Sequence, residues 1–171
     1  ELMAIATRFA RGDAELDEGN IWEALADPAT TGLGDVMWIV DFNRQSLDRV
    51  VPGVRIHQWR SQFEAAGWHV VEVKYGQRLM AAFEQPRGEA LRDWIDGMPN
   101  EQYQSVFGLP PAEARARFLE SAPAEVVDML ANYTDEDCAR LVRDLGGHDM
   151  EQLLEAFAQC DTVTDRPSVV F

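Results

Sequence analysis

The chain has 171 residues, of which 46% are hydrophobic, and a formal net charge of −15 from 30 acidic and 15 basic residues. This length and composition fit one domain with a substantial core. The acidity argues against binding to nucleic acid or to an anionic membrane, because both need basic patches. Since no apolar run approaches the roughly 20 residues of a membrane span, and residues 1–11 do not resemble a signal peptide, we expect a soluble protein.

The first part of the chain has the pattern of a parallel βαβ unit. Met3–Phe9 and Val36–Phe42 are short, apolar and rich in β-forming residues, and a helical stretch opening at Asp17 lies between them. Asp13 follows the first of these strands and Asn43 the second. Because parallel strands end on the same side, both side chains should project from one carboxyl edge of the sheet, where open α/β folds bind ligands.

The oxygen ligands at this edge predict a metal-bridged diphosphate site. The Asp13 carboxylate, the Asn43 amide oxygen and the backbone carbonyl of Gln45 are hard ligands that suit Mg²⁺. Gly12 and Ala14 are small enough to let the backbone approach a diphosphate, and the N-terminus of the next helix offers amide donors. The alternative is that Asp13 caps a turn and Asn43 fills an ordinary loop, since both residue types favour such places.

One more helix and strand follow before the chain turns helical. Val54–Ala66 has apolar residues on one helical face, and Trp68–Lys74 reads as a third strand. From residue 77 to residue 159 amphipathic helices follow one another, and Thr134 with Asp137 forms a capping-box-like start for one of them.

The last helix and strand follow Asp149, which is placed to cap that helix. Ser168–Phe171 reads as a strand at the end of the chain. Cys138 and Cys160 fall in predicted helices, which favours reduced thiols and a cytoplasmic protein over a disulfide. The helix that follows Asp149 is predicted to turn four residues toward the core: Leu153, Leu154, Phe157 and Ala158.

Several of these segments resemble a known family. Gly12-Asp13-Ala14, roughly 25 to 30 intervening residues and the turn around Asn43 are similar to the cofactor-anchoring signature of the thiamine-diphosphate enzymes of the transketolase class. GDAELDEGNIWEAL and VDFNRQSLDRV resemble most the homodimeric pyruvate dehydrogenase, the decarboxylating first component of its complex. FEAAGWHVVEVKYG and the run Gly146–Asp149 are similar to the same enzymes, so the resemblance covers nearly the whole chain.

The resemblance implies a partial thiamine-diphosphate-binding domain over residues 1–171, with a parallel sheet, flanking helices and a helical segment at about 77–159. It makes Asp13, Asn43 and the Gln45 carbonyl the ligands of Mg²⁺, and it assigns no catalytic residue. Two positions depart from the family pattern, because Ala14 replaces a Gly and Asp41 stands where an Asn often occurs. The cofactor-binding residues that it implies are Gly12, Asp13, Ala14, Glu15 and Asn43.

It further implies an oxidoreductase that decarboxylates a 2-oxo acid such as pyruvate and passes the acyl group to a lipoyl group on an acyltransferase partner. The chain begins at Glu1 directly in a strand and looks cut from a longer one. We therefore expect a homo- or hetero-oligomer that supplies the aminopyrimidine-binding domain. Strands at both chain ends should leave sheet edges uncovered, which also favours association.

Two other functions remain open. One is a non-catalytic or split-subunit relative with a structural or regulatory role, and the other is a ketol-transferring, transketolase-like enzyme. The exact 2-oxo acid cannot be read from these residues. His57 and His148 are more easily explained as solvated or loop-fixing residues than as catalytic ones, and their roles also stay open.

Overall fold

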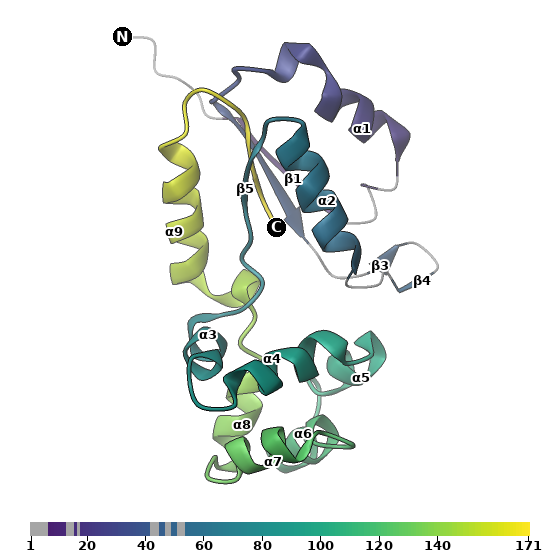
Figure 1. The fold of residues 1–171 in the computed structure, drawn as a ribbon, viewed down its shortest axis with the longest axis vertical. Helices are drawn as coiled ribbons and strands as arrows, with labels where there is room; N and C mark the ends of the chain where they lie inside the picture. The colour runs from purple at the N-terminus through teal and green to yellow at the C-terminus, as the bar shows by residue number, and fades with distance from the viewer. Residues whose placement is uncertain (1–6, 13–15, 17, 42–44, 47–48, 51–53) are drawn as a thin grey trace. The chain divides into compact units, whose positions relative to one another are not determined.

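The computed structural model of the chain describes residues 7–12, 16, 18–41, 45–46, 49–50 and 54–171. The chain separates into two compact units, labelled by element in Figure 1. The sheet unit comprises Glu1–Lys74 and Met150–Phe171, and the helical unit comprises Tyr75–Asp149. That residues 1–171 act as a single domain stays a prediction.

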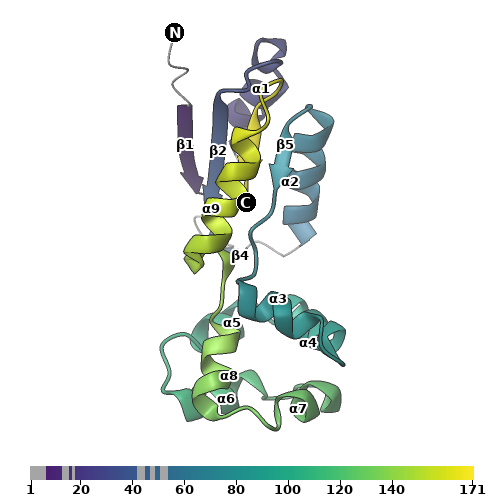
Figure 2. The same cartoon turned by 90° about the vertical axis from the view of Figure 1, so that its left-hand side faces the viewer.

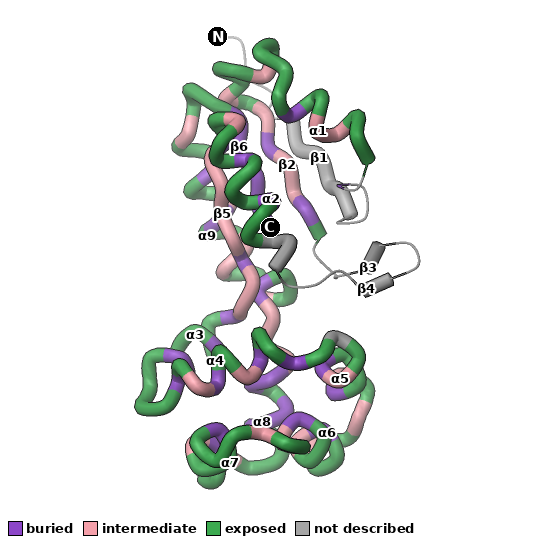
Figure 3. The backbone as a smooth tube through the Cα atoms, turned by 45° about the vertical axis from the view of Figure 1, so that its right-hand side comes forward, coloured by how far each residue is buried: buried purple, intermediate pink, exposed green. Residues whose placement is uncertain are grey.

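Four parallel strands form the main sheet of the sheet unit, in the order β1-β2-β6-β5. The predicted parallel α/β fold is therefore confirmed. The expectation that the last strand leaves an open edge is wrong, because β6 lies between β2 and β5 and is buried along its length (Figure 3). Uncharged residues suit a strand that is covered on both faces. The strands are β1 (Thr7–Gly12), β2 (Val36–Asp41), β5 (His69–Val71) and β6 (Ser168–Val170).

Helices cover both faces of this sheet (Figures 1 and 2). On one face α1 (Gly19–Ala26) and α2 (Val54–Ala65) pack over a core that contains Phe63 and Trp68. On the other face α9 (Met150–Asp161) packs over strand residues such as Met37. A short 3-10 helix, η2 (Pro28–Thr30), follows α1.

The inward face of α9 differs from the prediction. Ala156 and Cys160 are buried against the sheet, and two of the four predicted residues are half-buried. The small side chains of Ala156 and Cys160 let the helix approach the strands closely. The apolar pattern of the sequence alone is compatible with burial of this face or of the predicted one. The half-buried pair is Leu153 and Phe157, and the predicted residues that are in fact exposed are Leu154 and Ala158.

The helical unit contains no strand among its described residues, as predicted, and it has its own core. The predicted cap at Thr134 is confirmed, because its side-chain oxygen accepts a hydrogen bond from the Asp137 amide at 3.1 Å. Its elements are α3 (Gln77–Phe83), α4 (Gly88–Gly97), α5 (Asn100–Ser105), α6 (Pro111–Phe118), α7 (Ala124–Leu130), α8 (Asp135–Val142) and the 3-10 helix η3 (Gly146–His148).

Hydrogen bonds join the two ends of the helical unit. The Gly76 amide donates to the Asp144 carbonyl at 2.7 Å, and the Gln77 amide donates to the Asp149 carboxylate at 3.0 Å. The Asp144 carboxylate also accepts from the Arg78 amide at 2.8 Å. A Cβ at Gly76 would lie 2.4 Å from the Asp144 carboxylate, so a side chain there would force Asp144 to shift. Carboxylates from the far end of the unit thus cap the start of α3.

Cys138 and Cys160 are thiols that form no disulfide, as predicted, and both are buried. Burial raises the pKa of the Cys138 thiol, and the Arg115 guanidinium opposes this shift in part. Among the residues that the structure describes, no helix is long and apolar enough to cross a membrane.

Candidate functional site at the carboxyl edge of the sheet

The strand ends that carry the predicted site lie side by side. β1 and β2 pair in parallel over their full length, and their last pair is Gly12 with Asp41. The chain therefore leaves both strands at the same edge, as the βαβ pattern predicts. Four predicted site residues follow these ends but lie outside the described residues: Asp13, Ala14, Glu15 and Asn43. Their assignment to the site stays a prediction.

Gln45, the predicted carbonyl ligand, begins a short strand. β3 (Gln45–Ser46) pairs antiparallel with β4 (Arg49–Val50), and Gln45 lies opposite Val50. Only a turn was expected here from the sequence. Strands of two residues are too short to show an alternating pattern, so the sequence offered no signal for this hairpin.

Leu16, which follows β1 by four residues, is held in the core of the sheet unit. Leu16 is 1% exposed and belongs to the core beneath α1 and α2. The indole N–H of Trp22, on α1, donates to the Leu16 carbonyl at 2.7 Å. Neither residue was predicted from the sequence to lie near the site, although a Leu and a Trp beside an acidic stretch are apolar groups that can anchor it.

The start of α1, at Gly19, lies three residues beyond Leu16. Its N-cap residue, Glu18, makes no side-chain capping hydrogen bond. First-turn amides of a helix attract anions, both through their free N–H groups and through the helix dipole. Glu18 at the start of α1 and Asp41 at the end of β2 are both exposed carboxylates. An anion bound near them would need a cation to offset the repulsion between like charges.

No three His, Cys, Asp or Glu side chains within the described part of the chain form a group that could hold a metal ion. Asp13 and Asn43 lie outside the described residues. The predicted donor set, a carboxylate, an amide oxygen and a backbone carbonyl, still has the hard-oxygen chemistry that Mg²⁺ prefers.

The two histidines whose roles were left open, His57 and His148, are both exposed. His57 lies on α2, where its carbonyl accepts a hydrogen bond from the Ser61 hydroxyl at 2.8 Å. His148 lies in η3, and its backbone amide donates to the Leu145 carbonyl at 3.0 Å. These are ordinary backbone contacts of helix turns, and the roles of the two imidazoles stay open.

Comparisons with known proteins bear on the same region. A family model described as the transketolase thiamine diphosphate binding domain matches residues 2–91, more than half of the chain. The chain is similar to the pyruvate dehydrogenase E1 component of Corynebacterium glutamicum, with 29% identity over 93% of this chain and 17% of that protein. Those of Escherichia coli K12 and Mycobacterium tuberculosis are 27% and 28% identical over 93% of this chain, and over 18% and 17% of their own lengths. The chain thus spans less than a fifth of these relatives.

Proposed function

Because the chain belongs to the family of transketolase thiamine-diphosphate-binding domains, we propose that the edge of its sheet beyond Gly12 and Asp41 anchors the diphosphate of thiamine diphosphate through Mg²⁺. The observation that carries this proposal is the parallel pairing of β1 and β2, whose last residues lie opposite each other. The carboxyl ends of neighbouring parallel strands are where open α/β folds bind their ligands.

In this proposal each predicted residue has a separate role. The Asp13 and Asn43 side chains and the Gln45 carbonyl hold Mg²⁺. Gly12 and Ala14 let the backbone approach the diphosphate, and Glu15 lies next to it. When bound, thiamine diphosphate supplies the carbanion chemistry of the reaction. The residues of this chain orient the diphosphate and transfer no proton.

The names of the relatives extend the proposal to a reaction. We propose oxidative decarboxylation of a 2-oxo acid, pyruvate, with acyl transfer to a lipoyl group on an acyltransferase partner. The chain spans less than a fifth of those relatives, so further protein would supply the aminopyrimidine-binding domain in a homo- or hetero-oligomer. Two buried thiols that form no disulfide support a cytoplasmic location.

A second candidate is ketol transfer, which the description of the matching family model favours. Both reactions use the same cofactor anchor, so products distinguish them and the metal site does not. A 2-oxo acid that yields carbon dioxide and an S-acylated, reduced lipoyl group supports the first candidate. A sugar product lengthened by two carbons supports the second.

The anchor itself can be tested by replacing Asp13 with Ala. In the assembly that holds the complete site, we expect thiamine diphosphate affinity in the presence of Mg²⁺ to fall about 100-fold or more, which corresponds to roughly 2.7 kcal/mol. Calorimetric titration with and without Mg²⁺ measures this loss.

Asp35→Ala is the matched control, because Asp35 is an exposed carboxylate just before the other end of β2. It should leave the affinity unchanged. An unaltered affinity in Asp13→Ala would refute the assignment of the anchor.

A further inference from the structure

We propose that one face of the main sheet is the docking surface for an amphipathic helix with basic flanks, supplied by protein outside these 171 residues. The proposal does not depend on the cofactor, and the match to the family model ends at residue 91, before α9 begins. The surface consists of apolar side chains on β2 and α9, and we call it the α9 patch: Ile39, Met150, Leu153, Leu154 and Phe157.

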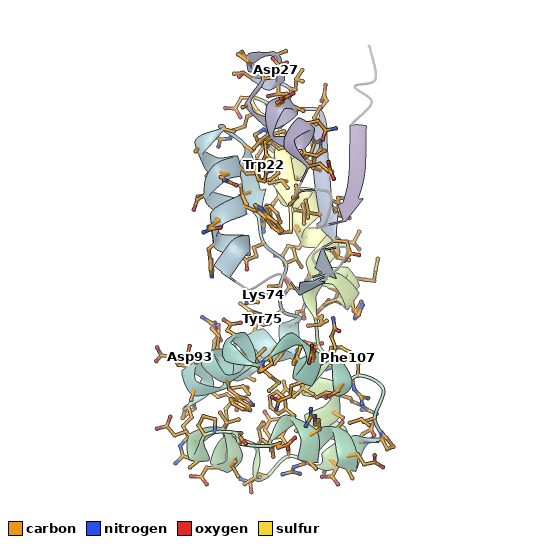
Figure 4. All side chains as sticks on the ribbon, turned by 90° about the vertical axis from the view of Figure 1, so that its right-hand side faces the viewer. Trp22, Asp27, Lys74, Tyr75, Asp93 and Phe107 are labelled. Atoms are coloured by element: carbon orange, nitrogen blue, oxygen red, sulfur yellow. The ribbon has the colours of Figure 1, made fainter. Side chains whose placement is uncertain are left out.

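The two faces of the main sheet differ in how far the described helices cover them. On one face α1 and α2 lie side by side, and the ring of Trp22 on α1 meets the ring of Phe63 on α2 edge-on, with centroids 6.1 Å apart (Figure 4). On the other face α9 is the one helix among the described elements, and it packs mainly over β5 and β6 (Figure 2). The side of this face toward β1 therefore has no described helix above it.

A second helix has room beside α9. Neighbouring strands lie about 4.8 Å apart, and a helix with its side chains is about 10 to 12 Å across, so one helix covers roughly two strands. Four strands therefore need about two helices on each face, and α1 with α2 provide these on the first face. Parallel sheets are normally covered on both faces, which leaves the side toward β1 for a helix from elsewhere.

The α9 patch is apolar and accessible. Met150 and Leu154 are 64% and 61% exposed, the two highest values among the large apolar side chains of the described residues. They are one helical turn apart, so they share a face of α9. Leu153 and Phe157 adjoin that face, and both pack with Ile39 against the same core while they remain half-buried. A second helix would remove this apolar surface from water.

The charges around the α9 patch select the partner. Glu151 and Glu155 are exposed and lie next to Leu154 on the helix surface. Asp161 is also exposed and lies one turn beyond Phe157, and α9 contains no Lys or Arg. A second copy of α9 would bring carboxylates against carboxylates, which repel each other. A helix whose apolar face is flanked by Lys or Arg would instead bury the patch and complement these charges.

A synthetic peptide tests this choice of partner. It is an amphipathic helix of about 18 residues, or five turns, with leucines on one face and lysines on both flanks. Its counterpart has glutamates in place of the lysines. Fluorescence anisotropy measures the binding of each labelled peptide to the chain. We expect the lysine peptide to bind at least about tenfold more tightly than the glutamate peptide, and the difference to decrease as salt is added.

Two double variants separate the α9 patch from the general acidity of the chain. Met150→Gln with Leu154→Gln removes the exposed apolar groups of the patch, and it keeps the net charge and good helix formers. We expect this variant to bind the lysine peptide about tenfold more weakly. The matched control is Met80→Gln with Val127→Gln, which removes apolar side chains that are 42% and 41% exposed on other helices. It should bind the peptide as the unaltered chain does.

Oxidation of Met150 by hydrogen peroxide tests the surface in the protein itself. The oxidant must reach the sulfur, so a covered methionine forms its sulfoxide more slowly than an accessible one. Mass spectrometry measures the rate at Met150 in the chain alone and in the complete assembly. We expect oxidation of Met150 to be about tenfold slower in the assembly.

Equal binding of the two peptides, or equal binding of the lysine peptide by the two double variants, would overturn the proposal. Slow oxidation of Met150 in the chain alone would also overturn it, because the patch would then be covered without a partner, and so would undiminished oxidation in the assembly. If Met150→Gln with Leu154→Gln disperses an oligomer of the chain in light scattering, a second copy occupies the patch and the proposal is wrong. Thiamine diphosphate takes part in none of these measurements, so this proposal and the proposed function fail separately.

Discussion

Arg143 shows how a single side chain completes the helical unit. It is half-buried, and its guanidinium donates to the carbonyls of Val106 at 2.9 Å and Leu109 at 2.5 Å. Val106 caps the C-terminal end of α5, where carbonyls have no partner within the helix. A cation at this place satisfies those oxygens and also interacts favourably with the helix dipole.

We therefore expect Arg143→Met to lower the free energy of unfolding by about 2 kcal/mol, because hydrogen bonds from a charged donor are lost and two carbonyls remain. Urea denaturation followed by circular dichroism measures this. Arg140→Met is the control, since the exposed pair of Arg140 with Glu136 should contribute no more than about 0.5 kcal/mol. Equal losses in the two variants would show that the carbonyl contacts of Arg143 stabilise the unit no more than an exposed ion pair does.

For single residues, the sequence predicts motifs better than it predicts the hydrogen-bond partners of side chains. Asp13 and Asn43 could be singled out because their spacing along the chain is itself informative. The hydrogen-bond partners of Arg143 and Trp22 could not be predicted, because both side chains donate to backbone carbonyls. A residue of any type can supply such an acceptor. A free carbonyl is the same chemical group at every position.

At the scale of elements, α3 depends on a cap from far along the chain. It begins after Gly76, which has no side chain, and the Asp144 carboxylate accepts from the Arg78 and Leu79 amides at 2.8 and 3.2 Å. The Asp144 side chain is only 12% exposed.

We expect Asp144→Ala to cost about 1 to 2 kcal/mol of stability through loss of this cap, and Asp144→Asn to cost less because it keeps an acceptor oxygen. Urea denaturation checks both. Asp128→Ala, which removes an exposed ion pair with Arg87, should cost under about 0.5 kcal/mol. A loss in Asp144→Ala no larger than this would contradict the capping role.

Most helices and strands of the described chain could be predicted, because each has a local pattern. β2 was expected at Val36–Phe42 and is found at Val36–Asp41. The position of β6 inside the sheet could not be predicted, since strand order depends on contacts between distant segments. The face of α9 was misjudged for a related reason: the pattern shows which residues are apolar, and the neighbouring strands decide which of them are buried.

For the whole molecule, we expect association and no independent turnover. α9 exposes two large apolar side chains, Met150 at 64% and Leu154 at 61%, and β1 and β5 form the edges of the main sheet. Both features favour contact with further protein.

Light scattering should detect an oligomer, and an artificial-acceptor assay should detect negligible pyruvate decarboxylation by these 171 residues alone. Addition of the protein that supplies the aminopyrimidine-binding domain should restore turnover. A stable monomer that decarboxylates pyruvate unaided would contradict the expected association and the expected incompleteness together.

The joined ends of the helical unit also bear on the order of folding. β5 and β6 are neighbours in the sheet but far apart along the chain, because the residues of the helical unit come between them in the sequence. Closing a long unfolded loop costs more entropy than closing a short one. Once the bonds from Gly76 to Asp144 and from Gln77 to Asp149 have formed, the intervening helices no longer count toward the length of that loop. Early folding of the helical unit would therefore turn a distant strand pairing into a nearly local one and remove much of the kinetic penalty of parallel topology.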